Sequence, residues 1–254
     1  MLILLPPSET KRSGGTDAPM TAQEWAHPGL TPQRTAVAEA LVALSADPER
    51  AAKVLGLGPR QLDDIRRNAE LATAATMPAV DRYTGVLFDA LGATTLSAAA
   101  RRWLAAHVHI HSAPFGPVAA LDPIPAYRLG AAVSLPGLPS SKRVWADAVS
   151  RALAEAAPDF LLDLRSQAYV ALGPIPAGVP SAYVRVVSEG ADGVARALNH
   201  FNKRTKGELV RDLAEARPRI RSRAGFLSWA AEAGWDARDD PSGGILLVAR
   251  AAVD

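Results

Sequence analysis

The stretch Leu2-Ile3-Leu4-Leu5-Pro6-Pro7 decides how the fold of this chain is interpreted. Four consecutive aliphatic residues closed by two prolines are typical of a short, buried strand that runs into a loop. Similar apolar runs at 160–164, 183–187 and 245–248 predict three more strands. Because helical patterns fill most of the chain between these runs, we predict an α/β fold with a mixed sheet covered by helices.

Capping residues and apolar spacing predict where the helices lie. Their expected ranges are 31–45, 48–55, 59–71, 83–91, a helix that follows Ser97, one that follows Ser140, and then 191–201, 205–216 and 222–233. The strict alternation over 107–111 predicts a further strand. The segment 112–138 is rich in proline and glycine and is expected to be a long ordered loop or a cover over a site.

The composition limits the class of protein. The chain has 254 residues, of which 48% are hydrophobic and 21% charged, and we expect one domain over 1–254. It has no cysteine, which excludes disulfides, thiolate nucleophiles, iron–sulfur clusters and Cys-based zinc sites. We predict no cofactor. No window approaches 18 uninterrupted apolar residues, so no membrane partner is predicted and the cytoplasm is the expected compartment.

The charge of the chain is unevenly distributed. The net charge is only +2, yet the segment 196–223 holds nine Lys and Arg side chains against three carboxylates. Such an imbalance favours an anionic partner at this part of the chain.

Five short sequence segments, in order along the chain, have recognisable patterns. They are Leu4–Lys11, Arg82–Leu91, Asp122–Leu129, Asp163–Tyr169 and His200–Gly207, and together they resemble the signatures of the YaaA family of peroxide-stress proteins. The resemblance implies a single-domain α/β fold, a role in limiting peroxide damage and labile iron and, for some members, DNA binding.

The sequence departs from the family pattern at two places. Ala119-Ala120 stands where an Arg-Pro pair is common before the equivalent of Asp122, and Gly130-Ala131-Ala132 replaces another frequent motif. The loss of this arginine leaves open a diverged paralogue with its own substrate.

The segment 48–71 fits a helix-hairpin-helix element. Gly56-Leu57-Gly58 turns sharply between two predicted helices, so that exposed backbone N–H groups, with Arg60, could hold a DNA phosphate. The alternative is an ordinary connection between packed helices, since Asp63 and Asp64 already complement the helix dipole.

Polar residues that follow the predicted strands form the candidate anion site. Ser8 and Lys11 come just after the first strand, where open α/β sheets place ligands, although an ordinary solvated lysine is the alternative. Tyr127-Arg128 and Arg165 offer donors that grip carboxylate or phosphate, although internal pairing of Arg128 with an Asp is the alternative. The predicted anion-binding set is Ser8, Lys11, Tyr83, Ser112, Asp122, Tyr127, Arg128, Arg165, His200, Asn202, Lys203 and Lys206.

Three functions are compatible with this set. The first is a stress-protective protein that binds DNA or a small, nucleotide-like anion. The second is an enzyme that acts on an anionic or heteroaromatic metabolite in the same pocket, with Lys11 and Asp163 in acid–base roles. The third is a scaffold in which these residues are structural.

Three histidines form the strongest candidate for a metal site. His107, His109 and His111 alternate along the predicted strand and would project from one face, within reach of one ion. Histidines that are satisfied by hydrogen bonds in the core are the alternative.

Overall fold

The predicted mixed sheet covered by helices is confirmed by a computed structural model, which describes residues 1–16, 18–21, 24–189, 195–196 and 199–249. The strands of the main sheet are β1 (Leu2–Leu5), β3 (Val108–Ser112), β4 (Gly116–Ala119), β6 (Leu161–Asp163), β7 (Ser181–Glu189), β8 (Ala195–Arg196), β9 (Ala237–Asp239) and β10 (Ile245–Val248). Their order is β4-β3-β1-β6-β7-β10-β9, and β8 pairs with the end of β7. A separate ribbon pairs β2 (Met77–Pro78) with β5 (Pro123–Ile124).

The centre of the sheet is parallel and its two edges are antiparallel. Strands β3, β1, β6, β7 and β10 run in one direction, while β4 and β9 run against their neighbours. Strand β1 lies in the middle and every one of its side chains is buried, as expected for a strand covered on both faces. The carboxyl ends of β1, β3 and β6 therefore meet at one edge of the sheet.

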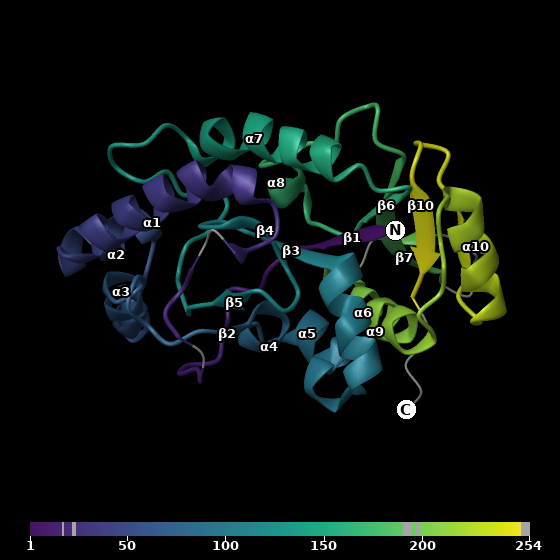
Figure 1. The fold of residues 1–254 in the computed structure, drawn as a ribbon, viewed down its shortest axis with the longest axis horizontal. Helices are drawn as coiled ribbons and strands as arrows, with labels where there is room; N and C mark the ends of the chain where they lie inside the picture. Colours follow the sequence, from purple (N-terminus) through teal and green to yellow (C-terminus); the bar gives the residue numbers. More distant parts are fainter. Residues whose placement is uncertain (17, 22–23, 190–194, 197–198, 250–254) are drawn as a thin grey trace.

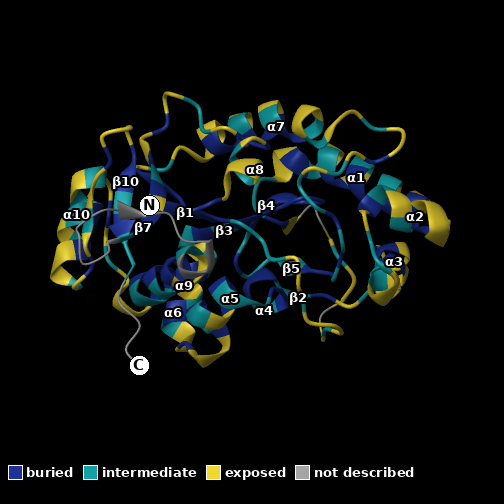
Figure 2. Ribbon diagram, turned by 180° about the vertical axis from the view of Figure 1, so that it is seen from behind, coloured by how far each residue is buried: buried dark blue, intermediate teal, exposed yellow. Residues whose placement is uncertain are grey.

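Helices cover both faces of the sheet (Figure 1). Their bounds are α1 (Thr31–Ser45), α2 (Pro48–Leu55), α3 (Leu62–Ala69), α4 (Ala79–Arg82), α5 (Val86–Leu91), α6 (Ala98–His107), α7 (Ser141–Ala156), α8 (Gln167–Val170), α9 (Asn199–Ala216) and α10 (Arg223–Glu232). In Figures 1 and 2, α1 and α7 lie above the sheet, whereas α5, α6 and α9 lie below it. Figure 2 shows that these helices turn buried faces inward and exposed faces outward.

Two predicted helices differ from those observed. The range 83–91 is not one helix, because the chain breaks between α4 and α5 at Gly85, whose φ of 93° is a conformation that favours glycine. The range 59–71 is a 3-10 turn at Pro59–Gln61 followed by α3, which ends at Ala69. Both errors arise where a local turn interrupts a continuous helical pattern.

Two further segments also differ from their predicted structure. The predicted loop 112–138 contains β4 and β5, whose pairing partners lie far away in the sequence. The predicted helix 191–201 is partly outside the described residues, and 195–196 within it is a strand, whereas α9 runs unbroken from Asn199. No helix of the described residues is both long enough and apolar enough to cross a membrane.

Candidate functional site

The candidate site lies at the carboxyl edge of the parallel strands. The loop that follows β1 carries Ser8 and Lys11, β3 ends at Ser112, and β6 ends at Asp163. This is the edge at which open α/β sheets bind ligands. Parallel pairing of β1 with both β3 and β6 brings these three segments together although they are far apart in the sequence.

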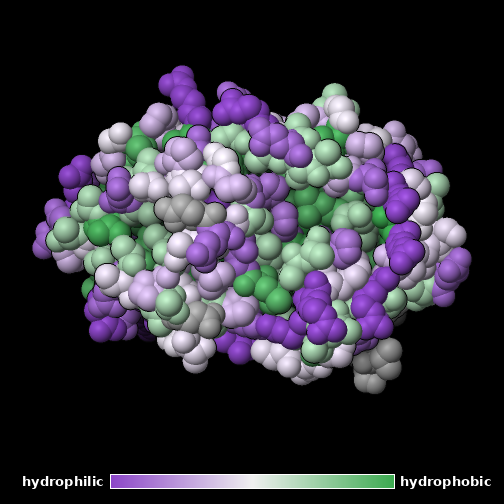
Figure 3. All heavy atoms as spheres, viewed as in Figure 1, coloured by the Kyte–Doolittle hydropathy of each residue, from purple (hydrophilic) through white to green (hydrophobic). Residues whose placement is uncertain are grey.

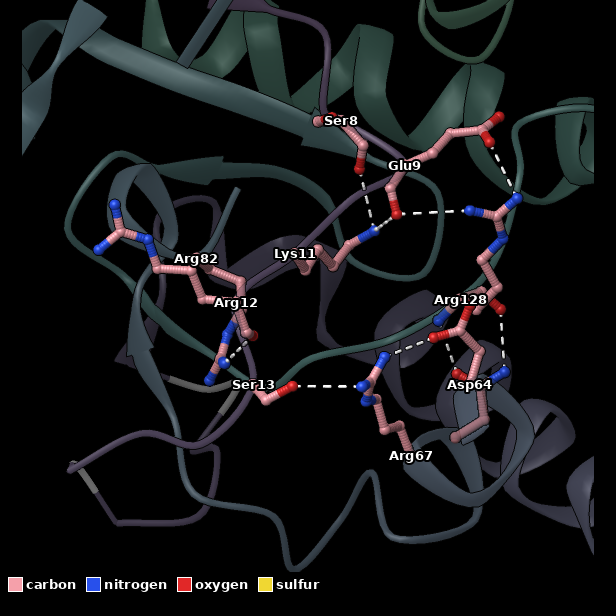
Figure 4. A network of polar contacts seen from close by, with 10 residues as sticks. Ser8, Glu9, Lys11, Arg12, Ser13, Asp64, Arg67, Arg82 and Arg128 are labelled. Atoms are coloured by element: carbon pink, nitrogen blue, oxygen red, sulfur yellow. Dashed lines mark hydrogen bonds and ion pairs between the residues drawn. The ribbon is translucent and has the colours of Figure 1, made fainter. Parts of the chain in front are cut away.

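Lys11 is a part-buried cation at this edge (Figure 4). Its Nζ donates hydrogen bonds to the carbonyl oxygens of Ser8, at 2.9 Å, and Glu9, at 3.2 Å. It also lies 4.0 Å from the centroid of the Tyr127 ring, a cation–π contact. Burial and the neighbouring charge of Arg128 lower the pKa of Lys11 to about 7, so the lysine is not the ordinary solvated side chain of the alternative prediction.

Arg128 contacts one of the two acceptors of Lys11, the carbonyl oxygen of Glu9. Its Nη1 donates to the carbonyl oxygen of Glu9, at 3.4 Å, and its Nη2 contacts the Glu9 carboxylate, at 2.9 Å. The backbone of Arg128 is fixed to α3, because the Asn68 side chain accepts from its N–H and donates to its carbonyl oxygen. The loop after β1 and the segment of Arg128 thus form one unit, as the prediction of a shared site requires.

Further arginines surround this unit (Figure 4). Arg67 contacts Asp64, at 2.6 Å, and donates to the Ser13 hydroxyl. Arg82 is wholly buried and donates to the carbonyl oxygens of Arg12 and three other residues, which fixes the loop from within. A hollow of about 200 Å³ opens beside them, lined by Ser13, Gly14, Arg67, Glu70, Ala74, Ala75 and Ala126.

Two tyrosines lie beneath Lys11. The hydroxyls of Tyr83 and Tyr127 are 2.7 Å apart and form a hydrogen bond, while the Ser112 hydroxyl donates to the carbonyl oxygen of Gly116 and accepts from the N–H of Phe115. Both rings are buried, and this burial raises the pKa of each hydroxyl well above its ordinary value. The hydroxyls therefore stay protonated and act as neutral hydrogen-bonding groups.

Asp163, the last residue of β6, and Arg165 form a buried ion pair. The Arg165 guanidinium donates from Nε and Nη2 to the two oxygens of Asp163, at 2.9 and 2.7 Å. It also contacts His111 Nδ1, at 3.0 Å, so that His111 Nε2 carries the hydrogen; this nitrogen is buried and has no partner. Arg165 thus pairs internally with Asp163, whereas Arg128, for which pairing with an Asp was the alternative prediction, contacts Glu9.

Helix α9 carries the remaining residues of the predicted anion-binding set. Lys206 is buried and Asn202 lies four residues earlier, whereas Lys203 is exposed and no contact joins it to Lys11 or Arg128. The side chain of His200 lies outside the described residues. Gly207 lets α9 approach α5, because a Cβ here would clash with the carbonyl oxygen of Leu87.

Asp122 and the altered segment before it are structural. The Asp122 carboxylate accepts from the N–H groups of Ala26, at 2.9 Å, and Ala119, at 2.8 Å. Ala120 is wholly buried in the core. The position of the replaced arginine, Ala119, is half-buried at the end of β4.

The hairpin of α2 and α3 has the turn that sequence predicts. Gly56 ends α2 in the left-handed conformation, with φ of 64°, and Gly58 precedes the 3-10 turn. Arg60 is exposed on this turn. The helix α3 packs against α1 and α2, so the hairpin is integral to the fold.

The prediction that three histidines project from one strand is wrong for His107. This residue ends α6, and its Nδ1 lies 2.8 Å from the carbonyl oxygen of Met1. His109 contacts His27, at 2.9 Å, while His111 contacts Arg165. Within the described ranges, no group of three or more His, Asp or Glu side chains is arranged to hold a metal ion.

The fold and this edge define a mixed-sheet α/β protein with a cation-rich loop at the carboxyl ends of its central strands. The chain belongs to the family described as Peroxide stress protein YaaA, whose model matches residues 1–235. This membership supports a peroxide-stress-related role and confirms the resemblance that the sequence blocks indicated.

Relatives match along most of their length. A UPF0246 protein of Corynebacterium efficiens is 45% identical over 232 residues, which cover 90% of either chain. One from Corynebacterium glutamicum is 40% identical over 246 residues, covering 95% of this chain and 96% of the relative. One from Streptomyces coelicolor is 43% identical over 215 residues, covering 84% and 82%.

Sequence reasoning missed several residues of the site. Glu9 lies inside the first signature block, so the block itself could have singled it out. Arg67 and Asn68 carry no such signal, because their contacts with Ser13 and Arg128 exist only in the folded chain.

Proposed function

We propose that the protein acts in peroxide stress by binding DNA or a nucleotide-like polyanion at the cationic cluster, defined as Lys11, Arg12, Arg67 and Arg128. The observation that carries this proposal is the convergence of Lys11 and Arg128 on the carbonyl oxygen of Glu9. Two cations that share one backbone acceptor create a positive potential that a phosphate can neutralise.

The charge balance of the cluster favours an anion. Its four cations face two nearby carboxylates, those of Glu9 and Asp64. The Glu9 side chain is 78% exposed, so its ion pair with Arg128 is weakly held and a phosphate can replace it. Arg12 is exposed and free to turn toward such a ligand.

The hairpin extends the same surface. Helix α3 has eight residues and spans about 12 Å, with Arg60 before its first turn and Arg67 in its last. That length corresponds to about three or four base pairs of one DNA strand. In Figure 3 hydrophilic residues are spread over the whole visible face, the end with α2 and α3 included. A phosphate backbone along α3 would contact Arg60 and the cationic cluster in turn, without base-specific readout.

The test is the binding of a fluorescent DNA duplex by anisotropy in a salt series. We expect affinity to fall steeply between about 50 and 200 mM salt, and Arg67→Met and Arg128→Met each to reduce the slope of log affinity against log salt by about one. Lys142→Met removes an exposed cation on α7 and is the matched control, with an unchanged slope. A flat titration, or equal slopes in all variants, would exclude this function.

An enzyme for a small anionic metabolite is the second candidate. It is favoured by the lowered pKa of Lys11, a value suited to proton transfer near neutral pH. DNA binding that is unaffected by Lys11→Met, together with a small anion whose binding that variant abolishes, would favour the enzyme over the DNA-binding protein.

A further inference from the structure

Lys206 is a buried lysine for which the described residues supply no acceptor. Only 5% of its surface is exposed, and it makes no hydrogen bond or ion pair with the described residues. Its Nζ lies 5.9 Å from the centroid of the Tyr183 ring. Asp163 is close enough for its charge to act on the lysine, but its carboxylate oxygens are already held by Arg165.

The other lysines of the site differ from Lys206. Lys11 donates to two carbonyl oxygens, and Lys203, on the same helix, is exposed to water. A buried ammonium without an acceptor is costly, which favours the neutral amine. Burial accordingly lowers the pKa of Lys206 to about 8, although the negative charge of Asp163 opposes this effect. Near neutral pH a substantial fraction of Lys206 therefore carries a free lone pair.

A second unpartnered group lies on the same face of α9. Asn202 precedes Lys206 by four residues, which places the two side chains one above the other. The Oδ1 atom of Asn202 is buried and has no hydrogen-bond partner in the part of the chain that the structure describes. Buried polar atoms are almost always paired, so an amine and an amide oxygen left unpaired together point to a ligand.

We propose that Lys206 is an amine nucleophile that forms an imine with a small aldehyde or ketone carrying a hydroxyl next to its carbonyl group. The ligand must be small because little of Lys206 is exposed. Its hydroxyl would donate to Asn202 Oδ1, which accepts but cannot donate. This activity goes beyond the binding of a polyanion and does not depend on it.

The chemical step needs only one proton from solvent water besides the amine and the carbonyl compound. The lone pair of Nζ attacks the carbonyl carbon, and one proton moves from this nitrogen to the carbonyl oxygen to give a neutral carbinolamine. The oxygen then takes the proton from solvent and leaves as water, which breaks the carbon–oxygen bond and forms the carbon–nitrogen double bond of a protonated imine. The charge of Asp163 stabilises the resulting cation, as it would stabilise the ammonium form.

Reductive trapping of the full chain with glycolaldehyde and cyanoborohydride tests this proposal. We expect a reduced adduct that peptide mapping assigns to Lys206, formed faster as pH rises through about 8 because the amine loses its proton. At pH 7.5 we expect labelling of Lys206 to exceed that of Lys203 on the order of a hundredfold, from the fraction of neutral amine at an ordinary lysine pKa. Any adduct on the terminal amine is mapped separately.

Two variants complete the experiment. Lys206→Arg should abolish the adduct, and Lys203→Arg, the matched control on the same helix, should leave it unchanged. Asn202→Leu should remove the preference for glycolaldehyde over acetaldehyde, which lacks the hydroxyl. Labelling spread evenly over exposed lysines, or an adduct at Lys11 in place of Lys206, would overturn the proposal; mapping of the wild-type protein decides this even if a variant fails to fold.

Discussion

At the scale of single residues, the Asp163–Arg165 pair is the contact on which the site depends most. Both side chains are almost fully buried, so each neutralises a charge that water cannot reach. We expect Arg165→Met to lower the free energy of unfolding by about 3–5 kcal/mol, since it leaves the Asp163 carboxylate buried and uncompensated. Urea denaturation followed by circular dichroism measures this loss.

A surface ion pair is the control for this prediction. Arg204 contacts Glu208 one helical turn away, at 2.8 Å, but its side chain is 65% exposed. Because water screens such a pair, Arg204→Gln should cost only about 0.5 kcal/mol. Equal losses for the two variants would show that burial does not govern the Asp163–Arg165 interaction.

The site was only partly predictable from single residues. Lys11 and Arg128 were predicted to line one site, because each lies inside a signature block. Their common acceptor is a backbone carbonyl oxygen, that of Glu9, and no side-chain pattern encodes it. The histidines were misread for a related reason: alternation over 107–111 takes no account of the helix that ends at His107.

At the scale of elements, the contact between α5 and α9 positions Lys206. The two helices approach so closely that a Cβ at Gly207 would clash with the carbonyl oxygen of Leu87 and lie 2.9 Å from the Ala90 Cβ. In an exposed helix Gly→Ala stabilises, but here the helices must separate. We expect Gly207→Ala to destabilise the fold by about 1–3 kcal/mol in thermal denaturation.

A glycine in open space separates this effect from a general effect of alanine. Gly178 is exposed, and a Cβ there would meet no atom within 4 Å. Gly178→Ala should therefore leave the melting temperature nearly unchanged or raise it slightly. A Gly207→Ala protein as stable as the wild type would mean that α5 and α9 adjust without cost.

Elements with a strong local signal were predicted well, and those that depend on distant partners were not. Strand β1 and helix α7 follow from an apolar run and from the Ser140 cap, which accepts from the Arg143 N–H. Strand β4 exists because β3 pairs with it, and β5 because β2 does, although both lie among prolines and glycines. The sequence therefore identified the turn-forming residues, but it did not identify the strand pairing on either side of them.

At the scale of the whole molecule, a single core joins both ends of the chain. Buried apolar residues from Leu2 to Leu247 form one connected cluster. The last strand, β10, pairs in parallel with β7, which in turn pairs with β6 beside the central strand β1. The C-terminal part of the sheet is thus built directly onto the N-terminal part.

This continuity predicts cooperative unfolding at a length where chains often divide into domains. Trp25 packs against Phe115 near one end of the sheet, whereas Trp235 donates to Asp212 beside β9 at the other. Variants that retain only Trp25 or only Trp235, with the other tryptophans replaced by Phe, report on each end by fluorescence. Each variant should show a fluorescence midpoint in urea that coincides with its own circular dichroism midpoint. If the Trp235 signal changed at lower urea while most secondary structure remained, the β7–β10 region would be a separate unit, and the prediction of one domain over 1–254 would be wrong.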